Sequence, residues 1–179
     1  LTGSAHGAHC TQTQSSNGAF VATASFNSSH RPHEKRYHGA MSHSKADNWE
    51  RALSEIITLH RTTPFKWGSH DCAVFAANVI WAISGEDPAR ELRGTYKSAQ
   101  QAKGALKRRG HTLLSFVDSK FARLQRVSMA KRGDLVFYRD EKSPFKGSLG
   151  VCEGLYSWFA DEHGLKPIKT ADCHHAWRV

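Results

Sequence analysis

The stretch from Asp71 to Ser84 most constrains the fold of this chain, because it is apolar at nearly every position. A helix that is hydrophobic on all sides has to be buried, since a surface helix keeps one polar face. Gly85 follows directly and offers the left-handed residue at which helices often end. The sequence therefore predicts a central helix from about Asp71 to Ser84, around which the rest of the domain packs.

Three further helical patterns flank this central helix. The first follows Ser44 and Asp47, which have the spacing of a capping box. Its apolar residues recur at helical spacing and are Trp49, Leu53, Ile56, Ile57 and His60. Ser98 and Gln101 form a second capping box before a short basic helix, and residues 113–124 are predicted as a fourth helix.

After Gly133 the pattern changes to that of β-strands. Short apolar and aromatic runs, separated by turn residues, cover residues 134–138, 149–152, 155–159, 165–168 and 174–179. The turn at residues 161–164 indicates a hairpin. Helices followed by a meander of antiparallel strands predict an α+β domain, with the N-terminal helices packed on a small antiparallel sheet.

Composition separates a leader from this domain. The chain has 179 residues, 39% of them hydrophobic, which is enough for one domain with a proper core. Residues 1–40 are rich in Ser, Thr, Asn, Gly and His and have no sustained period, so we expect a disordered leader before a domain at 41–179. No segment has the apolar length of a membrane span, and no signal peptide is recognisable. We therefore expect a cytoplasmic product, or one exported by another route.

The formal net charge of +9 points to polyanions as candidate partners. The basic residues gather in two clusters, which are Lys103, Lys107, Arg108 and Arg109, and then Arg123, Arg126, Lys131 and Arg132. Such clusters also occur as ordinary solvated faces of a domain. Nucleic-acid binding is therefore kept as a weaker alternative function.

Cys72 is the residue best placed for chemistry, because a loop leads directly into the central helix at this point. Free N–H groups and the positive end of the helix dipole stabilise a thiolate, so we expect a thiol that ionises more easily than usual. The alternative is a small buried core cysteine. The other cysteines, Cys10, Cys152 and Cys173, form no paired spacing, so we expect no disulfide framework, no metal site and no cofactor.

Several motifs resemble the NlpC-type branch of the papain-like cysteine peptidases, which cut peptide bonds in peptidoglycan. They are Trp67-Gly68, Asp71-Cys72, Gly133-Asp134-Leu135-Val136 and Leu149-Gly150-Val151. The chain is still more similar to an uncharacterised phage and prophage domain family of this fold, which also shares the final Ala176-Trp177-Arg178-Val179. The resemblance covers about residues 48–179 and implies a papain-like fold with Cys72 as the nucleophile.

The chain departs from the peptidase pattern at Ser148. The resemblance places the catalytic histidine of NlpC-type enzymes immediately before the Leu149-Gly150-Val151 triplet, where this chain has Ser148. His174 and His175 are the candidate replacements, and strand alternation sends only one of them inward. His70 and His163 are weaker candidates, since the first is only two residues from Cys72 and the second lies in a turn.

Two functional classes remain open after the sequence alone, beside the weaker alternative of nucleic-acid binding. In the first, the domain is a cysteine hydrolase of cell-wall peptides, with Cys72 and His174 or His175 catalytic. In the second, it is a degenerate phage module for tail assembly or host attachment, cytoplasmic before assembly or associated with the virion. In both, Trp67, Asp71 and Ser148 are assigned to ligand contact around Cys72, although Asp71 also has the position of a helix cap. The expected partners are peptidoglycan peptide or phage tail proteins.

Overall fold

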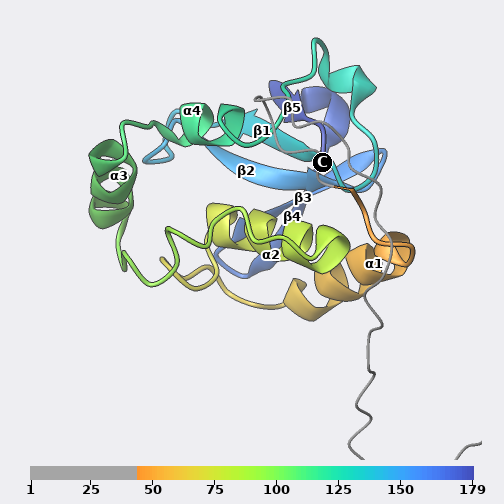
Figure 1. Cartoon of the computed structure of the whole chain (residues 1–179), viewed down its shortest axis with the longest axis horizontal. Helices are drawn as coiled ribbons and strands as arrows, with labels where there is room; N and C mark the ends of the chain where they lie inside the picture. The colour runs from red at the N-terminus through yellow and green to blue at the C-terminus, as the bar shows by residue number, and fades with distance from the viewer. Residues whose placement is uncertain (1–43) are drawn as a thin grey trace, which may run out of the picture. The chain divides into compact units, whose positions relative to one another are not determined.

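A computed structural model describes residues 44–179 of the chain (Figure 1). The disordered leader predicted for residues 1–40, with Cys10, lies outside these described residues. In the described part helices come first and strands last, which confirms the predicted α+β class. No helix among residues 44–179 is long and apolar enough to cross a membrane.

The helices confirm that the apolar stretch forms the centre of the domain. Within residues 44–179 the α-helices are α1 (Trp49–His60), α2 (Cys72–Ser84), α3 (Ala99–Arg108) and α4 (Leu113–Asp118). Phe75, Val79 and Ile83 of α2 are fully buried. Gly85 ends α2 in the left-handed conformation, with a φ of 74°, as its position predicted.

The strands form one antiparallel sheet in the order β4-β3-β2-β1-β5. They are β1 (Leu135–Arg139), β2 (Gly147–Cys152), β3 (Tyr156–Asp161), β4 (Gly164–Lys169) and β5 (His175–Trp177). The pairing of Asp161 with Gly164 confirms the predicted hairpin between β3 and β4. The predicted meander is wrong at its last strand, because β5 crosses to the opposite edge and pairs with β1, with Trp177 opposite Leu135.

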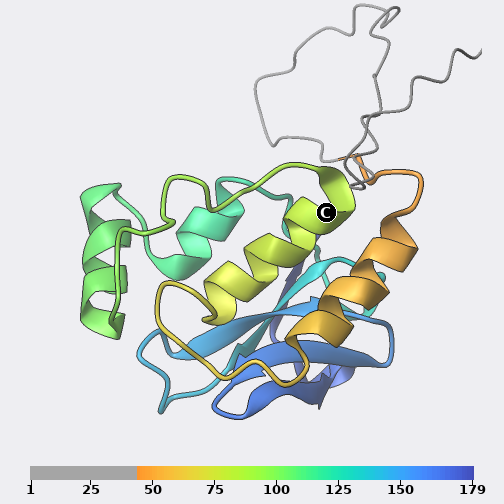
Figure 2. The same ribbon diagram turned by 90° about the horizontal axis from the view of Figure 1, so that it is seen from below.

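α1 and α2 lie side by side across one face of the sheet (Figure 2). The main hydrophobic core lies between them and the strands. A smaller apolar cluster on the other face contains Val136, Cys152, Phe159, Cys173 and Ala176. Cys152 and Cys173 therefore fill the core of the sheet side, as expected for small buried residues.

Two helix boundaries differ from the sequence prediction. The capping box of Ser44 and Asp47 is wrong: α1 begins at Trp49 after Asn48, which makes no side-chain cap bond. The fourth helix ends at Asp118, because the following segment pairs with the last strand and the Leu124 N–H donates to the Ala176 carbonyl, 2.8 Å away. The cap at Ser98 is confirmed, since its hydroxyl accepts from the Gln101 N–H.

Asp134 fastens residues 178 and 179 to the start of β1. Its side chain is fully buried and accepts hydrogen bonds from Arg178 Nη1 (2.7 Å), the Lys131 N–H (2.8 Å) and the Val179 N–H (3.2 Å). A buried carboxylate is tolerated only when its lone pairs are satisfied in this way. The Asp of the Gly133-Asp134-Leu135-Val136 motif therefore has a structural role.

Candidate functional site

The turn before α2 is built around Asp71, which positions Cys72 as the first helical residue. One oxygen of the Asp71 carboxylate accepts the backbone N–H groups of Ala73 and Val74, each at 3.0 Å, and the other accepts the Gly68 N–H at 2.8 Å. Asp71 is 1% exposed. One buried side chain thus holds both the loop and the start of the helix, which confirms its interpretation as a helix cap. The assignment of Asp71 to ligand contact is wrong, because its carboxylate is occupied by backbone N–H groups and it does not line the cleft beside Cys72.

Gly68 is required at this turn for two reasons. Its φ is 76°, and a Cβ atom would lie 2.0 Å from the Tyr96 carbonyl oxygen. The close approach packs Tyr96 against the turn. Burial raises the pKa of the Tyr96 hydroxyl, and the Asp71 carboxylate, to which it is hydrogen-bonded, raises that pKa further. Sequence reasoning missed Tyr96, because no motif links it to the loop it supports.

The Cys72 thiol is buried and is harder to ionise than a free thiol. Only 5% of Cys72 is exposed. Burial raises the pKa of the thiol, and the Asp71 carboxylate raises it further. Hydrogen bonds from the Leu149 backbone, the Ser148 hydroxyl and the Ala73 backbone oppose this rise without reversing it. The expectation of an easily ionised thiol was wrong, because desolvation outweighs the helix terminus.

Ser148 lies beside the Cys72 thiol, at the place where the resemblance puts a histidine. It is half-buried in β2, opposite Tyr138 of β1, and its hydroxyl helps to lower the pKa of the neighbouring Cys72 thiol. The structure therefore brings together Cys72 and Ser148, two of the residues singled out in the sequence. A hydroxyl cannot accept a proton from the thiol near neutral pH, so this pair has no general base.

A cleft of about 380 Å³ opens at the Cys72 sulfur and at Ser148. It lies where β2 and β3 diverge, since these strands pair only from Gly150–Cys152 to Ser157–Phe159. The walls carry five aromatic side chains, which are Phe65, Trp67, Tyr138, Phe145 and Phe159. Charged side chains at the cleft are Asp140, Asp161, Glu162 and Lys166. Trp67 is thus placed at the cleft, as predicted, and none of the described residues that line it is a histidine.

The structure does not bring His174 or His175 to this cleft. His174 is exposed, and its Nδ1 atom accepts the Arg139 N–H at 3.2 Å. His175 is half-buried and stacks on Phe137, with ring centroids 6.0 Å apart. Phe137 lies between His175 and Leu149 in the register, so His175 is two strands, or about 10 Å, from the Cys72 side of β2. The predicted alternation, with one histidine inward and one outward, is confirmed. His163 is exposed in the β3–β4 turn.

His70 is buried and forms a pair with the half-buried His60 at the end of α1. The two imidazole rings stack with centroids 4.7 Å apart, and Phe75 packs against both. Neither ring nitrogen of His70 forms a hydrogen bond with the described residues, and neither does His60 Nδ1. Burial lowers the pKa of both histidines, while the neighbouring Pro64 backbone and the Asp71 carboxylate partly oppose this for His70. Both rings are therefore neutral in the fold near pH 7.

This histidine pair predicts a loss of stability in mild acid. The unfolded chain, in which the histidine pKa is about 6.5, binds protons more readily than the native state, in which the pKa of both histidines is lowered. The native state is therefore favoured at a pH above about 6.5 and loses stability as the pH falls below it. We expect the melting temperature to fall by about 3–5 °C more between pH 7.5 and pH 5 than in a double variant, His60→Phe with His70→Phe. Thermal unfolding followed by circular dichroism measures this. His163→Gln is the control with an exposed ring, and a double variant as acid-sensitive as the parent chain would contradict the assignment.

The basic clusters of the sequence are partly neutralised by acidic neighbours. Arg109 lies 3.7 Å from Glu91, and Arg123 lies 2.8 Å from Asp118. Arg132 approaches Glu50 and Glu153, at 3.9 Å each. Exposed ion pairs of this kind contribute little to stability, but they reduce the field available to a polyanion. No group of three or more His, Cys, Asp or Glu suited to a metal ion occurs within residues 44–179.

The fold and the site together define an α+β domain with a buried cysteine at the first turn of its central helix, facing a cleft at a split in the sheet. Residues 44–179 match the family described as Domain of unknown function (DUF6950), and the chain belongs to that family. A comparison with curated proteins finds no match.

Proposed function

We propose that residues 44–179 form a papain-like domain of NlpC type, of phage or prophage origin, that binds cell-wall peptide at the host surface without cleaving it. The order of elements supports the papain-like assignment, since a cysteine begins the central helix and an antiparallel sheet follows it. The motifs Asp71-Cys72 and Leu149-Gly150-Val151 meet in space, as that resemblance requires.

The position of Ser148 beside Cys72 in the cleft carries the non-catalytic part of this proposal. Peptide cleavage by a thiol needs a base to take its proton and an acid to return one to the leaving amine. Ser148 supplies neither, and burial keeps the thiol protonated near pH 7. The Asp71 carboxylate already accepts the N–H groups of Ala73 and Val74 in the first turn of α2, so these two groups do not supply an oxyanion site.

The chemistry of the cleft matches a peptide that carries amino groups. Aromatic side chains cover the backbone and the apolar parts of a bound peptide at low entropic cost. Exposed carboxylates of Asp140, Asp161 and Glu162 attract ammonium groups, and Lys166 can pair with a carboxylate. Cell-wall peptides contain both kinds of charged group. The acidic rim argues against a nucleic acid at this cleft.

Binding and turnover of purified wall peptides test the proposal directly. We expect binding by isothermal titration calorimetry and no products by chromatography. Trp67→Ala is expected to weaken binding at least tenfold, because it removes an aromatic wall of the cleft. Trp81→Ala is the matched control, since Trp81 is exposed about 13 Å along α2 from Cys72 and lies outside the cleft.

The remaining outcomes separate the alternatives. Cleavage that disappears in Cys72→Ala would show a hydrolase and overturn the proposal. An absence of binding, with the fold intact by circular dichroism, would overturn it in favour of tail assembly or another partner. Equal binding by the Trp67 and Trp81 variants would place the peptide elsewhere on the domain.

A further inference from the structure

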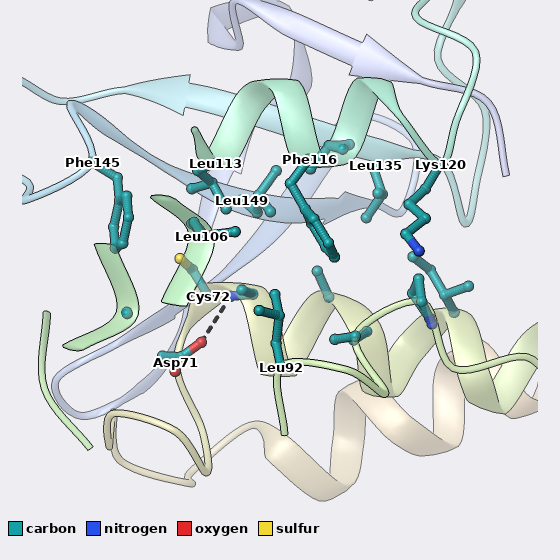
Figure 3. Close-up of a pocket in the computed structure, with 18 of the residues that line it drawn as sticks. Asp71, Cys72, Leu92, Leu106, Leu113, Phe116, Lys120, Leu135, Phe145 and Leu149 are labelled. Carbon is teal, nitrogen blue, oxygen red and sulfur yellow. Dashed lines mark hydrogen bonds between the residues drawn. The ribbon is translucent and has the colours of Figure 1, made fainter. Parts of the chain in front are cut away.

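A second, apolar pocket lies on the inner side of Cys72, between α2, α3, α4 and the sheet (Figure 3). Its volume is about 50 Å³. The side chains that line it are mostly aliphatic or aromatic and include Ala76, Ala102, Leu106, Leu113, Phe116 and Leu149. The Cys72 sulfur lies towards the Phe145 end of this pocket, and Lys120 lies at the opposite end (Figure 3).

The pocket and the cleft share a boundary. Trp67, Cys72 and Phe145 line both of them. The rings of Trp67 and Phe145 are tilted against each other with centroids 6.2 Å apart. A group bound in the cleft thus lies next to the pocket, with the thiol and two aromatic side chains at the boundary. Among residues 44–179, no others line both cavities.

The charged groups of the pocket, Asp71 and Lys120, already have partners. The Asp71 carboxylate is occupied by backbone N–H groups, and the Lys120 ammonium lies 2.9 Å from Glu91. A water molecule needs two to four polar partners and about 10–15 Å³, so the pocket is poorly suited to water although it is large enough. By the same measure it has room for roughly four heavy atoms. An aliphatic group of three or four carbons fits both its size and its polarity.

We propose that this pocket binds a branched aliphatic group of the ligand, of the size of a valine or leucine side chain, while the polar part of the same ligand occupies the cleft. The inference rests on the proposed function of the cleft and deepens it by naming a specificity pocket. Burial of such a group removes apolar surface from water, which favours a ligand with this side chain over one with a single methyl group.

Alkyl methanethiosulfonates of increasing length test the pocket without any wall peptide. The Cys72 thiolate attacks the sulfenyl sulfur, an S-alkyl disulfide forms, and methanesulfinate leaves. At pH 9, where the thiolate is more abundant, we expect the isobutyl and butyl reagents to modify Cys72 about tenfold faster than the methyl reagent. Peptide mass mapping separates Cys72 from the buried Cys152 and Cys173, whose rates are the internal reference.

The reagents can also differ in intrinsic reactivity, independently of the pocket. Variants that fill the pocket separate this effect from binding in the pocket. Ala76 lies one helical turn after Cys72 and lines the pocket, so Ala76→Leu should abolish the length preference and leave the melting temperature unchanged or raised. Ala102→Val fills the pocket from α3 and covers the case in which the first variant folds poorly. Ala82→Leu is the matched control, since Ala82 is exposed on α2 away from the pocket.

Each result decides between the two proposals. Equal rates for all reagents, or a length preference that survives both filling variants, would overturn the pocket even if wall peptide still binds. A length preference without wall-peptide binding would overturn the proposed function and leave the pocket established. If both proposals hold, Ala76→Leu should weaken the binding of peptides that carry a branched aliphatic residue at the pocket. The binding of peptides with alanine at the same position should not change.

Discussion

Asp134→Ala is expected to lower the free energy of unfolding by about 3–5 kcal/mol, the largest stability effect of any single polar substitution that we predict. The change leaves the Arg178 guanidinium and the N–H groups of Lys131 and Val179 without their buried acceptor. Urea denaturation followed by tryptophan fluorescence measures the loss. Tryptophan fluorescence is a suitable signal because Trp177 is fully buried and directly precedes Arg178, which binds Asp134.

Two companion variants make this prediction specific. Asp134→Asn keeps the shape and one acceptor oxygen, so it should cost clearly less than the alanine variant. Asp172→Ala removes an exposed carboxylate and should change stability by less than about 0.5 kcal/mol. If Asp134→Ala behaved like Asp172→Ala, residues 178 and 179 would not be fastened to β1 as described.

Ser148→His is expected to increase the alkylation rate of Cys72 at pH 7 by at least about tenfold. An imidazole in place of the hydroxyl can take the thiol proton and form an ion pair, which lowers the pKa of Cys72 and raises the thiolate fraction. The gain is smaller than the rise in thiolate, because nucleophilicity falls with pKa. Iodoacetamide labelling from pH 6 to 10, read by peptide mass mapping, gives the rate and its pH dependence.

The control for this substitution is Ser148→Ala. Loss of the hydroxyl removes a hydrogen bond that lowers the pKa of Cys72, so this variant should react more slowly than the parent chain at every pH below the thiol pKa. A rate profile unchanged in Ser148→His would mean that residue 148 does not face the sulfur. Acquisition of wall-peptide cleavage would identify the missing base as the main difference from an enzyme.

The elements that depend on residues close together in the sequence could be predicted. The apolar run of α2, its end at Gly85 and the turn at residues 161–164 each carry their own local signal, and the structure agrees with all three. The position of β5 depends on a long-range pairing with β1, for which strand alternation contains no information. The segment after Asp118 was predicted helical for the same reason, since its bonds to β5 are not visible in the local pattern.

The candidate site divides in a similar way. Motif order placed Cys72, Trp67 and Ser148 together, and the structure confirms that they meet at one cleft. The ionisation of the thiol was predicted with the wrong sign, because burial by Leu149 and Phe145 depends on packing between distant segments. The apolar pocket also could not be predicted, because its walls come from helices and strands that are far apart in the sequence.

The position of β5 at the outer edge of β1 also determines when the domain can become complete during synthesis. β1 to β4 form successive hairpins, whereas β1 gains its second neighbour only after residues 175–177 have emerged. Until then the β1 edge lacks its second neighbour, and the Asp134 carboxylate lacks the hydrogen bonds from Arg178 and Val179. An open strand edge of this kind is prone to pair with other chains. A nascent chain released before residue 179 should therefore aggregate rather than accumulate as a folded, shortened domain.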